Sequence, residues 1–269
     1  MTSPAEKRAA FRALHQEGCF VMPNPWDVGS AMALQNLGFK AIATTSAGMA
    51  WAMGLTDGGV TREAVLGHLA ALAAATHIPL NADFENGFAD RPEGVAESVA
   101  LAVDAGVAGL SIEDFTGDPA APLYDFTLAV ERIAAARQAI GNSGVVLTAR
   151  AEGFLRGRPD LDETLRRLTA FAEAGADCLY APLLPGEAEI ATVVRAVAPK
   201  AVNVLASRMP VATLAGLGVR RISVGGSLAL VAWDAFAEAA KQIGETGTFD
   251  ALSRGANRAN LQALLTAQP

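Results

Sequence analysis

The sequence contains few residues of the reactive kinds, with two cysteines and three histidines among 269 residues. The cysteines, Cys19 and Cys178, cannot form the disulfide framework of a small secreted domain, and we expect both to be inert core thiols. His15 and His68 fall in expected helices, and His77 precedes an expected strand. These positions argue against a histidine-bound zinc site and against a histidine general base.

Positive charge is also scarce, since 21 Lys and Arg residues face 28 Asp and Glu residues for a net charge of −7. This balance argues against a protein that binds nucleic acid or an anionic membrane surface. The mean hydropathy is +0.28, yet the least polar stretch, residues 41–56, includes four hydroxyl side chains. It is shorter than the roughly 20 apolar residues of a spanning helix. The charged, amphipathic start lacks the apolar segment of a secretory signal, so we expect a soluble, cytoplasmic protein.

Eight short apolar runs are interpreted as β-strands. Each is nearly continuous in apolar residues, which is typical of parallel strands covered on both faces. They lie at residues 19–23, 40–45, 78–83, 107–113, 144–150, 176–181, 201–206 and 219–225. Helical periodicity between them is clearest at residues 63–75, 92–105, 129–140, 161–174 and 187–197. Eight strand–helix alternations predict an α/β fold, a (β/α)₈ TIM barrel, formed as a single domain over residues 1–269.

A doubly wound open sheet is the competing fold. It is disfavoured because no G-x-G-x-x-G turn follows the first strand and because eight strands are expected. Residues 229–243 are interpreted as the last barrel helix, and residues 248–266 as an extra C-terminal helix. The extra helix packs either on its own barrel or on a neighbouring subunit.

Acidic residues gather where the expected strands end. Asp83, Glu113 and Arg150 end the third, fourth and fifth runs, while Asp57 and Glu85 lie in the loops after the second and third. In a barrel the loops after the strands converge at one end, and converging carboxylates repel one another unless a cation lies among them. A hard cation such as Mg²⁺ or Mn²⁺ suits oxygen ligands, while an arginine suits a substrate carboxylate or phosphonate. The alternative is that these acids cap helices or pair with rim arginines.

Five sequence segments occur in an order that suggests a family. They are P-N-P-W-D at residues 23–27, T-S-A-G at 45–48 with G-L-T-D at 54–57, D-F-E-N-G-F at 83–88, I-E-D at 112–114, and T-A-R-A-E at 148–152. With these segments the sequence resembles the isocitrate lyase/phosphoenolpyruvate mutase superfamily over essentially its whole length. The resemblance implies a Mg²⁺-dependent barrel that acts on small 2-oxo or 2-hydroxy acids through an enolate-like intermediate.

The resemblance also implies roles for individual residues. Asp83 would be a direct metal ligand, Glu85 and Glu113 would hold the metal directly or through its waters, and Asp57 would join the outer shell. The substrate would be bound by Ser46, by the backbone N–H groups of Ala47 and Gly48, and by Arg150, with Trp26 and Asn203 beside it. Family members commonly form tetramers in which the last barrel helix swaps between paired subunits, so a homo-oligomer, dimer or tetramer, is expected.

The loop at residues 115–124 departs from the family pattern. It contains no Cys, Lys or His, whereas the lyases carry a K-K-C-G-H-type motif there. Tyr124 and Asp118 are the remaining candidates for an acid or base in this loop. Because decarboxylation of a 2-oxo acid needs fewer such groups, we predict an oxaloacetate-decarboxylase-like or 2-hydroxy-diacid-lyase-like enzyme. The alternatives are a phosphonomutase or phosphonopyruvate hydrolase, with Arg156 or Arg158 facing the phosphonate, and a protein that binds 2-oxo acids without catalysis.

Overall fold

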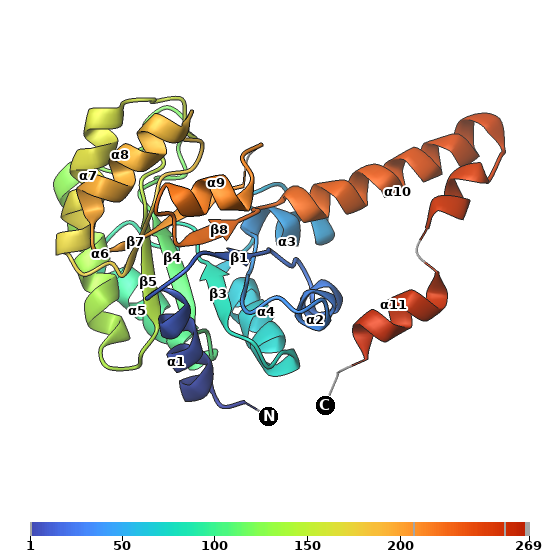
Figure 1. Cartoon of the computed structure of the whole chain (residues 1–269), viewed down its shortest axis with the longest axis horizontal. Coiled ribbons are helices and arrows are strands. Elements are labelled where there is room, and N and C mark those ends of the chain that lie inside the picture. Colours follow the sequence, from blue (N-terminus) through green and yellow to red (C-terminus); the bar gives the residue numbers. More distant parts are fainter. Residues whose placement is uncertain (1, 207, 256, 267–269) are drawn as a thin grey trace.

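The structure, a computed structural model, describes residues 2–206, 208–255 and 257–266. Its single parallel sheet has the order β1-β8-β7-β6-β5-β4-β3-β2 (Figure 1). The strands are β1 (Phe20–Met22), β2 (Ile42–Ala43), β3 (Leu80–Asp83), β4 (Gly109–Glu113), β5 (Val146–Arg150), β6 (Cys178–Tyr180), β7 (Ala201–Leu205) and β8 (Arg221–Ser223). Between β1 and β2, the Ala43 N–H donates to the Pro23 carbonyl at 3.0 Å. The sheet is therefore a nearly closed barrel, and the predicted (β/α)₈ TIM fold is confirmed.

Helices follow the strands around the outside of the barrel. They are α2 (Val28–Asn36), α3 (Ser46–Ala52), α4 (Arg62–Ala75), α5 (Pro92–Asp104), α6 (Phe126–Ile140), α7 (Leu161–Glu173), α8 (Glu187–Val197) and α9 (Val211–Gly216). The five helices predicted by periodicity correspond to α4 through α8. The helices at α2, α3 and α9 were not assigned from the sequence because they are short and only weakly periodic.

The helix α1 (Pro4–Leu14) closes the barrel at the amino ends of the strands. Phe11 is fully buried in a cluster with Phe20, Met22 and Val146 from the strands. The Arg12 side chain adds a hydrogen bond of 2.8 Å to the Gly144 carbonyl. Since this end is filled with apolar side chains, a ligand must enter from the carboxyl ends of the strands, where TIM-barrel sites lie.

The C-terminal helices depart from the prediction. The helix α10 (Ser227–Thr246) extends away from the barrel, and only Ala229 is buried in it (Figure 1). The predicted extra helix is divided into a 3₁₀ helix, η1 (Asp250–Arg254), and α11 (Arg258–Leu265); residue 256 lies outside the described residues. The division arises because Gly255 ends η1 and the Asn257 side chain caps α11.

The arm formed by α10, η1 and α11 returns to the barrel at α2. There the Asn36 side chain donates to the Leu264 carbonyl at 2.8 Å. The helix predicted at residues 229–243 is present as part of α10, and it does not cover its own barrel. Within the described ranges, no helix has the combination of length and apolar character that crossing a membrane requires.

Candidate active site

An ionic cluster lies at the carboxyl ends of three neighbouring strands. The β4–β5 register places Glu113 beside Arg150, and Asp83 ends the adjacent β3. The Nη1 atom of Arg150 lies 2.8 Å from Asp83 Oδ1 and 2.8 Å from Glu113 Oε1. Its Nη2 atom lies 2.9 Å from Oε1 of Glu152, which follows β5. The structure thus brings Asp83, Glu113 and Arg150 into direct contact.

Negative charge exceeds positive charge in this cluster. Arg156 contacts Glu152 Oε2 at 3.1 Å and Glu113 Oε2 at 3.3 Å. Burial raises the pKa of Glu113 well above its ordinary value; Arg150 opposes this change, while Glu152 and Asp83 add to it. Burial alone would lower the pKa of Arg150, but the surrounding carboxylates raise it well above its usual range. Arg150 therefore stays charged, and the acids retain a surplus that a further cation would offset.

Glu85 has a buried carboxylate oxygen, Oε1, without a hydrogen-bond partner in the described part of the chain. Burial, followed by repulsion from Asp83 and Asp57, raises the pKa of Glu85 to about 7. Glu85, Asp57 and Glu113 line one cavity of about 640 Å³. An unpartnered carboxylate oxygen beside other carboxylates is a suitable donor for a hard divalent cation. The residues fit such an ion in charge and in donor type.

The described acidic side chains do not surround a single position that a metal ion could occupy. Among the described residues, no group of three or more His, Cys, Asp or Glu side chains is placed to hold a metal ion. The reason is visible in the ion pairs, because the Arg150 guanidinium lies between Asp83 and Glu113. Arg150 therefore fixes two of the predicted ligands, while Glu85 and Asp57 form no ion pair with an arginine in the described part of the chain.

Tyr124 has a different position from the predicted one. Its hydroxyl donates to Asp90 Oδ1 at 2.6 Å, and its ring lies 3.9 Å below the Arg132 guanidinium. Arg132 in turn donates to the carbonyls of Asn86, Ala89 and Asp90. Burial and then Asp90 raise the pKa of Tyr124 to about 12. Tyr124 thus supports the loop after β3, which carries Glu85, instead of presenting an acid to the described cavities.

A second cavity, here called the chamber, has a volume of about 160 Å³ and lies inside the upper barrel. Five of the predicted site residues line it: Ser46, Ala47, Asp83, Arg150 and Asn203. The Asn203 side chain donates to Ser223 Oγ at 3.0 Å and accepts from Arg221 Nε at 2.8 Å. The chamber and the larger cavity share Ser46, so the two spaces meet at the start of α3.

The predicted carboxylate cradle is only partly available. The N–H and the hydroxyl of Ser46 both donate to Asp83 Oδ2, each at 3.0 Å. The N–H of Gly48 donates to Thr45 Oγ1 at 3.2 Å, which caps α3. Ala47 lines the chamber, whereas Gly48 does not. Gly48 is therefore a packing residue, and Ser46 orients Asp83.

The close packing at Gly48 leads to a testable prediction. A Cβ atom there would lie 2.6 Å from Thr45 Cγ2 and 3.0 Å from Trp26 Cβ. We expect Gly48→Ala to destabilise the protein by about 1 to 3 kcal/mol, the usual cost of overpacking, despite the better helix propensity of alanine. Urea unfolding measures the change, and Gly67→Ala in α4, where nothing lies within 4 Å, is the matched control. Equal stability of the two variants would contradict the packing role.

Trp26 also contributes to packing at this end of the barrel. Its backbone N–H donates to Ser30 Oγ at 3.1 Å, and its Cβ approaches α3 at Gly48. It is absent from the described linings of both cavities. The neighbouring Asn24 is more closely tied to the site, because its side chain bonds the Thr44 carbonyl and the N–H groups of Val224 and Gly225.

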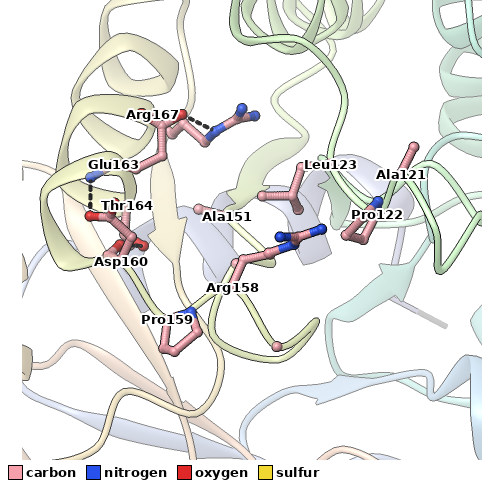
Figure 2. A pocket seen from close by; sticks show the side chains of 12 residues that line it. Ala121, Pro122, Leu123, Ala151, Arg158, Pro159, Asp160, Glu163, Thr164 and Arg167 are labelled. Carbon is pink, nitrogen blue, oxygen red and sulfur yellow. Dashed lines mark hydrogen bonds and ion pairs between the residues drawn. The ribbon is translucent and has the colours of Figure 1, made fainter.

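A third cavity, of about 590 Å³, lies beside the loop after β5. Figure 2 shows the Arg158 side chain extending into it between Ala151 and Pro122. At its wall, Arg167 pairs with Asp114 at 3.1 Å, and Asp114 Oδ1 accepts from the Glu152 N–H at 2.7 Å. Burial raises the pKa of Asp114 to about 6, although its bonds to Glu152 and Arg167 oppose this change. Asp114 therefore anchors the segment that carries Glu152.

Among the chamber-lining residues that the sequence did not predict, Tyr180 and Arg221 have the largest polar side chains. Arg221 begins β8, away from the strand ends where site residues are expected, and Tyr180, which ends β6, belongs to a mostly apolar run. A signal was present, because side chains alternate between the two faces of a strand. The register pairs Arg221 with Asn203 on the neighbouring strand. If the Asn203 side chain points into the barrel, that of Arg221 does too, whereas the side chain of Arg220 points out of the barrel.

The chain matches the sequence profile described as phosphoenolpyruvate phosphomutase over residues 11–244. It is 31% identical over 180 residues to the 2-methylisocitrate lyase of Escherichia coli (strain K12), which covers 64% of this chain and 60% of that enzyme. The crystal structure of a lyase/mutase-type protein from Burkholderia cenocepacia J2315 is 46% identical, with a TM-score of 0.93 and 96% of both chains covered. Phosphonopyruvate hydrolase, crystallised with oxalate and Mg²⁺, shares the fold, with a TM-score of 0.85 and 24% identity over 98% of this chain and 95% of that one.

Proposed function

Because the chain belongs to the phosphoenolpyruvate phosphomutase family of the isocitrate lyase/phosphoenolpyruvate mutase superfamily, we propose that it cleaves a carbon–carbon bond in a small 2-oxo or 2-hydroxy carboxylic acid through an enolate. The observation that carries this proposal is the unpartnered, buried Oε1 of Glu85. It lies in a surplus of carboxylates at the barrel mouth, where a cation and an anionic substrate would complete the charge balance.

In this proposal, Asp83, Glu85 and Glu113 hold Mg²⁺ or Mn²⁺, and Asp57 faces the same cavity. When bound, the ion would supply Lewis-acid chemistry to the oxygens of the substrate. Arg150 keeps Asp83 and Glu113 in fixed positions through its two contacts of 2.8 Å, and Ser46 fixes the other oxygen of Asp83. Such preorganisation means that the acids need little rearrangement during the reaction.

The loop at residues 115–124 favours decarboxylation over a lyase reaction. It folds as a small hairpin, in which Phe115 pairs with Leu123 and the Thr116 N–H donates to the Pro122 carbonyl. Its sequence contains no Cys, Lys or His, and the Tyr124 hydroxyl is bonded to Asp90. Decarboxylation of a 2-oxo diacid needs no base at the outset. The carbon–carbon bond to the carboxylate breaks and CO₂ leaves, while the electron pair of that bond stays on the remaining fragment as the enolate. The enolate then takes a proton from water.

One observation supports the phosphonate alternative. Arg156 lines the larger cavity and packs over the Phe115 ring at 3.6 Å, where its charge faces the proposed metal ligands. A guanidinium in this position could bind a phosphonate group. Its two contacts with Glu113 and Glu152 engage much of its donor capacity, so the carbon–carbon reaction remains our first proposal.

Product analysis tests the proposal. The protein is incubated with Mg²⁺ and, separately, oxaloacetate, 2-methylisocitrate and phosphonopyruvate, and the products are separated by chromatography. We expect pyruvate and CO₂ from oxaloacetate at a rate well above that of Mg²⁺ alone. Pyruvate and succinate from 2-methylisocitrate would instead identify a lyase, and release of inorganic phosphate from phosphonopyruvate would identify a phosphonate hydrolase. Oxalate binding without turnover of any of the three would identify a binding protein and refute the catalytic proposal.

A further inference from the structure

Arg221 is a charged residue buried inside the barrel without a carboxylate partner among the described residues. It is 2% exposed, and its side chain lines the chamber. Its hydrogen-bond partners are Asn203 Oδ1 at 2.8 Å, Thr148 Oγ1 at 2.9 Å and His15 Nε2 at 3.4 Å. All three are neutral acceptors, since burial and then Arg221 lower the pKa of His15 to about 3. The positive charge of Arg221 is therefore not offset by the groups that bond it.

The bonds of Arg221 leave part of its donor capacity unused. A guanidinium has five N–H groups, and three of them are directed to Asn203, Thr148 and His15. A buried charge that is neither paired nor fully hydrogen-bonded is strongly unfavourable. A ligand of opposite sign in the chamber would offset this charge and accept the remaining N–H groups.

Arg150 cannot take this role alone, although it lines the same chamber. Its Nη1 atom already contacts Asp83 and Glu113, and its Nε and Nη2 atoms contact Glu152. Three carboxylates therefore neutralise the charge of Arg150. The contrast between the two buried arginines leaves Arg221 as the source of uncompensated positive charge in the chamber.

The rest of the chamber is suited to a small anion. Hydroxyl and amide groups from Ser111, Tyr180, Asn203 and Ser223 line it, and Asp83 is the one carboxylate among its described lining residues. Burial raises the pKa of Tyr180 to about 12, so its hydroxyl remains a neutral donor. The volume of about 160 Å³ is below the roughly 300 Å³ at which pockets hold whole drug-sized ligands. It admits a small acid and excludes a drug-sized molecule.

We propose that the chamber binds the carboxylate of a small organic acid, and that Arg221 is the substrate-binding residue whose uncommitted charge holds it. This inference rests on the proposed function and deepens it, because it assigns the carboxylate to the chamber and the metal-binding acids to the adjoining cavity. It also limits the substrate class to compact acids whose carboxylate end fits beside Asn203 and Ser223.

Calorimetric titration with oxalate in the presence of Mg²⁺ tests the assignment. We expect Arg221→Gln, which removes the charge, to weaken oxalate binding at least about tenfold, as for loss of a charge-assisted hydrogen bond. Arg221→Lys restores the charge and is expected to recover most of the affinity. Wild-type affinity in a folded Arg221→Gln protein would overturn the proposal.

A second variant remains informative if Arg221→Gln does not fold. Asn203→Asp replaces the acceptor at 2.8 Å from Arg221 Nε with a carboxylate, which neutralises the buried charge within the protein. We expect a higher melting temperature together with oxalate binding weakened at least about tenfold. Because the new carboxylate would itself border the chamber and repel an anion there, weakened binding supports an anion site in the chamber, and unchanged oxalate affinity would overturn the proposal.

The same variants separate this inference from the proposed reaction. In EDTA, oxalate is expected to raise the melting temperature of the wild type but not that of Arg221→Gln. If this difference persists while no substrate is turned over, the anion site stands and the proposed reaction fails. If the wild type turns over oxaloacetate and Arg221→Gln keeps full activity and oxalate affinity, the anion site fails and the reaction stands.

Discussion

Replacing Asp83 with asparagine is expected to abolish stabilisation by Mg²⁺ and to lower turnover roughly a thousandfold, or by about 4 kcal/mol. Asp83 contacts Arg150 through Oδ1 and Ser46 through Oδ2, so the substitution removes the charge at the centre of the acidic cluster while preserving side-chain size. For the wild type, Mg²⁺ at about 100 times its Kd should raise the melting temperature by about 5 to 8 °C. Differential scanning calorimetry with and without Mg²⁺ measures this shift.

Asp177→Asn is the matched control for the Asp83 variant. Asp177 is also an acid with an arginine partner, Arg137 at 2.9 Å, but it precedes β6 at the opposite end of the barrel. We expect this variant to lose some stability while keeping the full Mg²⁺ shift and the full turnover. An Mg²⁺ shift that survives in Asp83→Asn would show that the ion binds elsewhere, and an absent shift in the wild type would reject the metal site.

Glu85 provides an independent check on the same acids. Its Oε1 atom has no partner in the described chain, and burial with two neighbouring carboxylates raises its pKa to about 7. Removing this charge should therefore stabilise the protein in EDTA, whereas a bound cation should reverse the preference. We expect Glu85→Gln to melt higher than the wild type in EDTA and lower in saturating Mg²⁺. A variant that melts lower in both conditions would contradict the proposed cation.

Local sequence patterns were sufficient to predict the barrel. Parallel strands covered on both faces are nearly continuous in apolar residues, so apolar runs in the sequence locate the strands. The run at residues 144–150, for example, contains β5 (Val146–Arg150). Helices were equally predictable where the helical spacing of apolar residues continued over several turns, as in α7. Periodicity does not specify what covers a helix, so the sequence predicted the helix at residues 229–243 and left open the surface on which it packs.

The site was less accessible from sequence because its parts depend on tertiary contacts. The acids at the strand ends were found, since barrel topology alone brings those positions together. Arg221 was missed because the chamber continues below the strand ends, where inward and outward residues differ only in register. Tyr124 was a candidate acid or base because the loop at residues 115–124 contains no Cys, Lys or His. In the structure its hydroxyl bonds Asp90 and its ring packs against Arg132, contacts that the sequence alone does not reveal.

Substituting aspartate for Val231 and Phe236 together is expected to dissociate the protein into monomers. These side chains on α10 are 68% and 64% exposed, and Trp233 packs edge-on against Phe236 at a centroid distance of 5.7 Å. A helix that leaves its own barrel with large apolar side chains in solvent is unfavourable alone. We propose that it packs on the barrel of a second copy, and that the wild type is a dimer or tetramer.

Light scattering coupled to size-exclusion chromatography measures this outcome. Loss of a buried interface aromatic such as Phe236 costs about 2 kcal/mol or more, so this substitution alone should raise the dissociation constant roughly 30-fold. Asp234→Lys changes the charge of the same helix at a polar position and is expected to leave the oligomer intact if Asp234 lies outside the contact. A wild type that remains monomeric at all concentrations would refute helix exchange. If the double variant Val231→Asp and Phe236→Asp remains oligomeric, the copies associate through another surface.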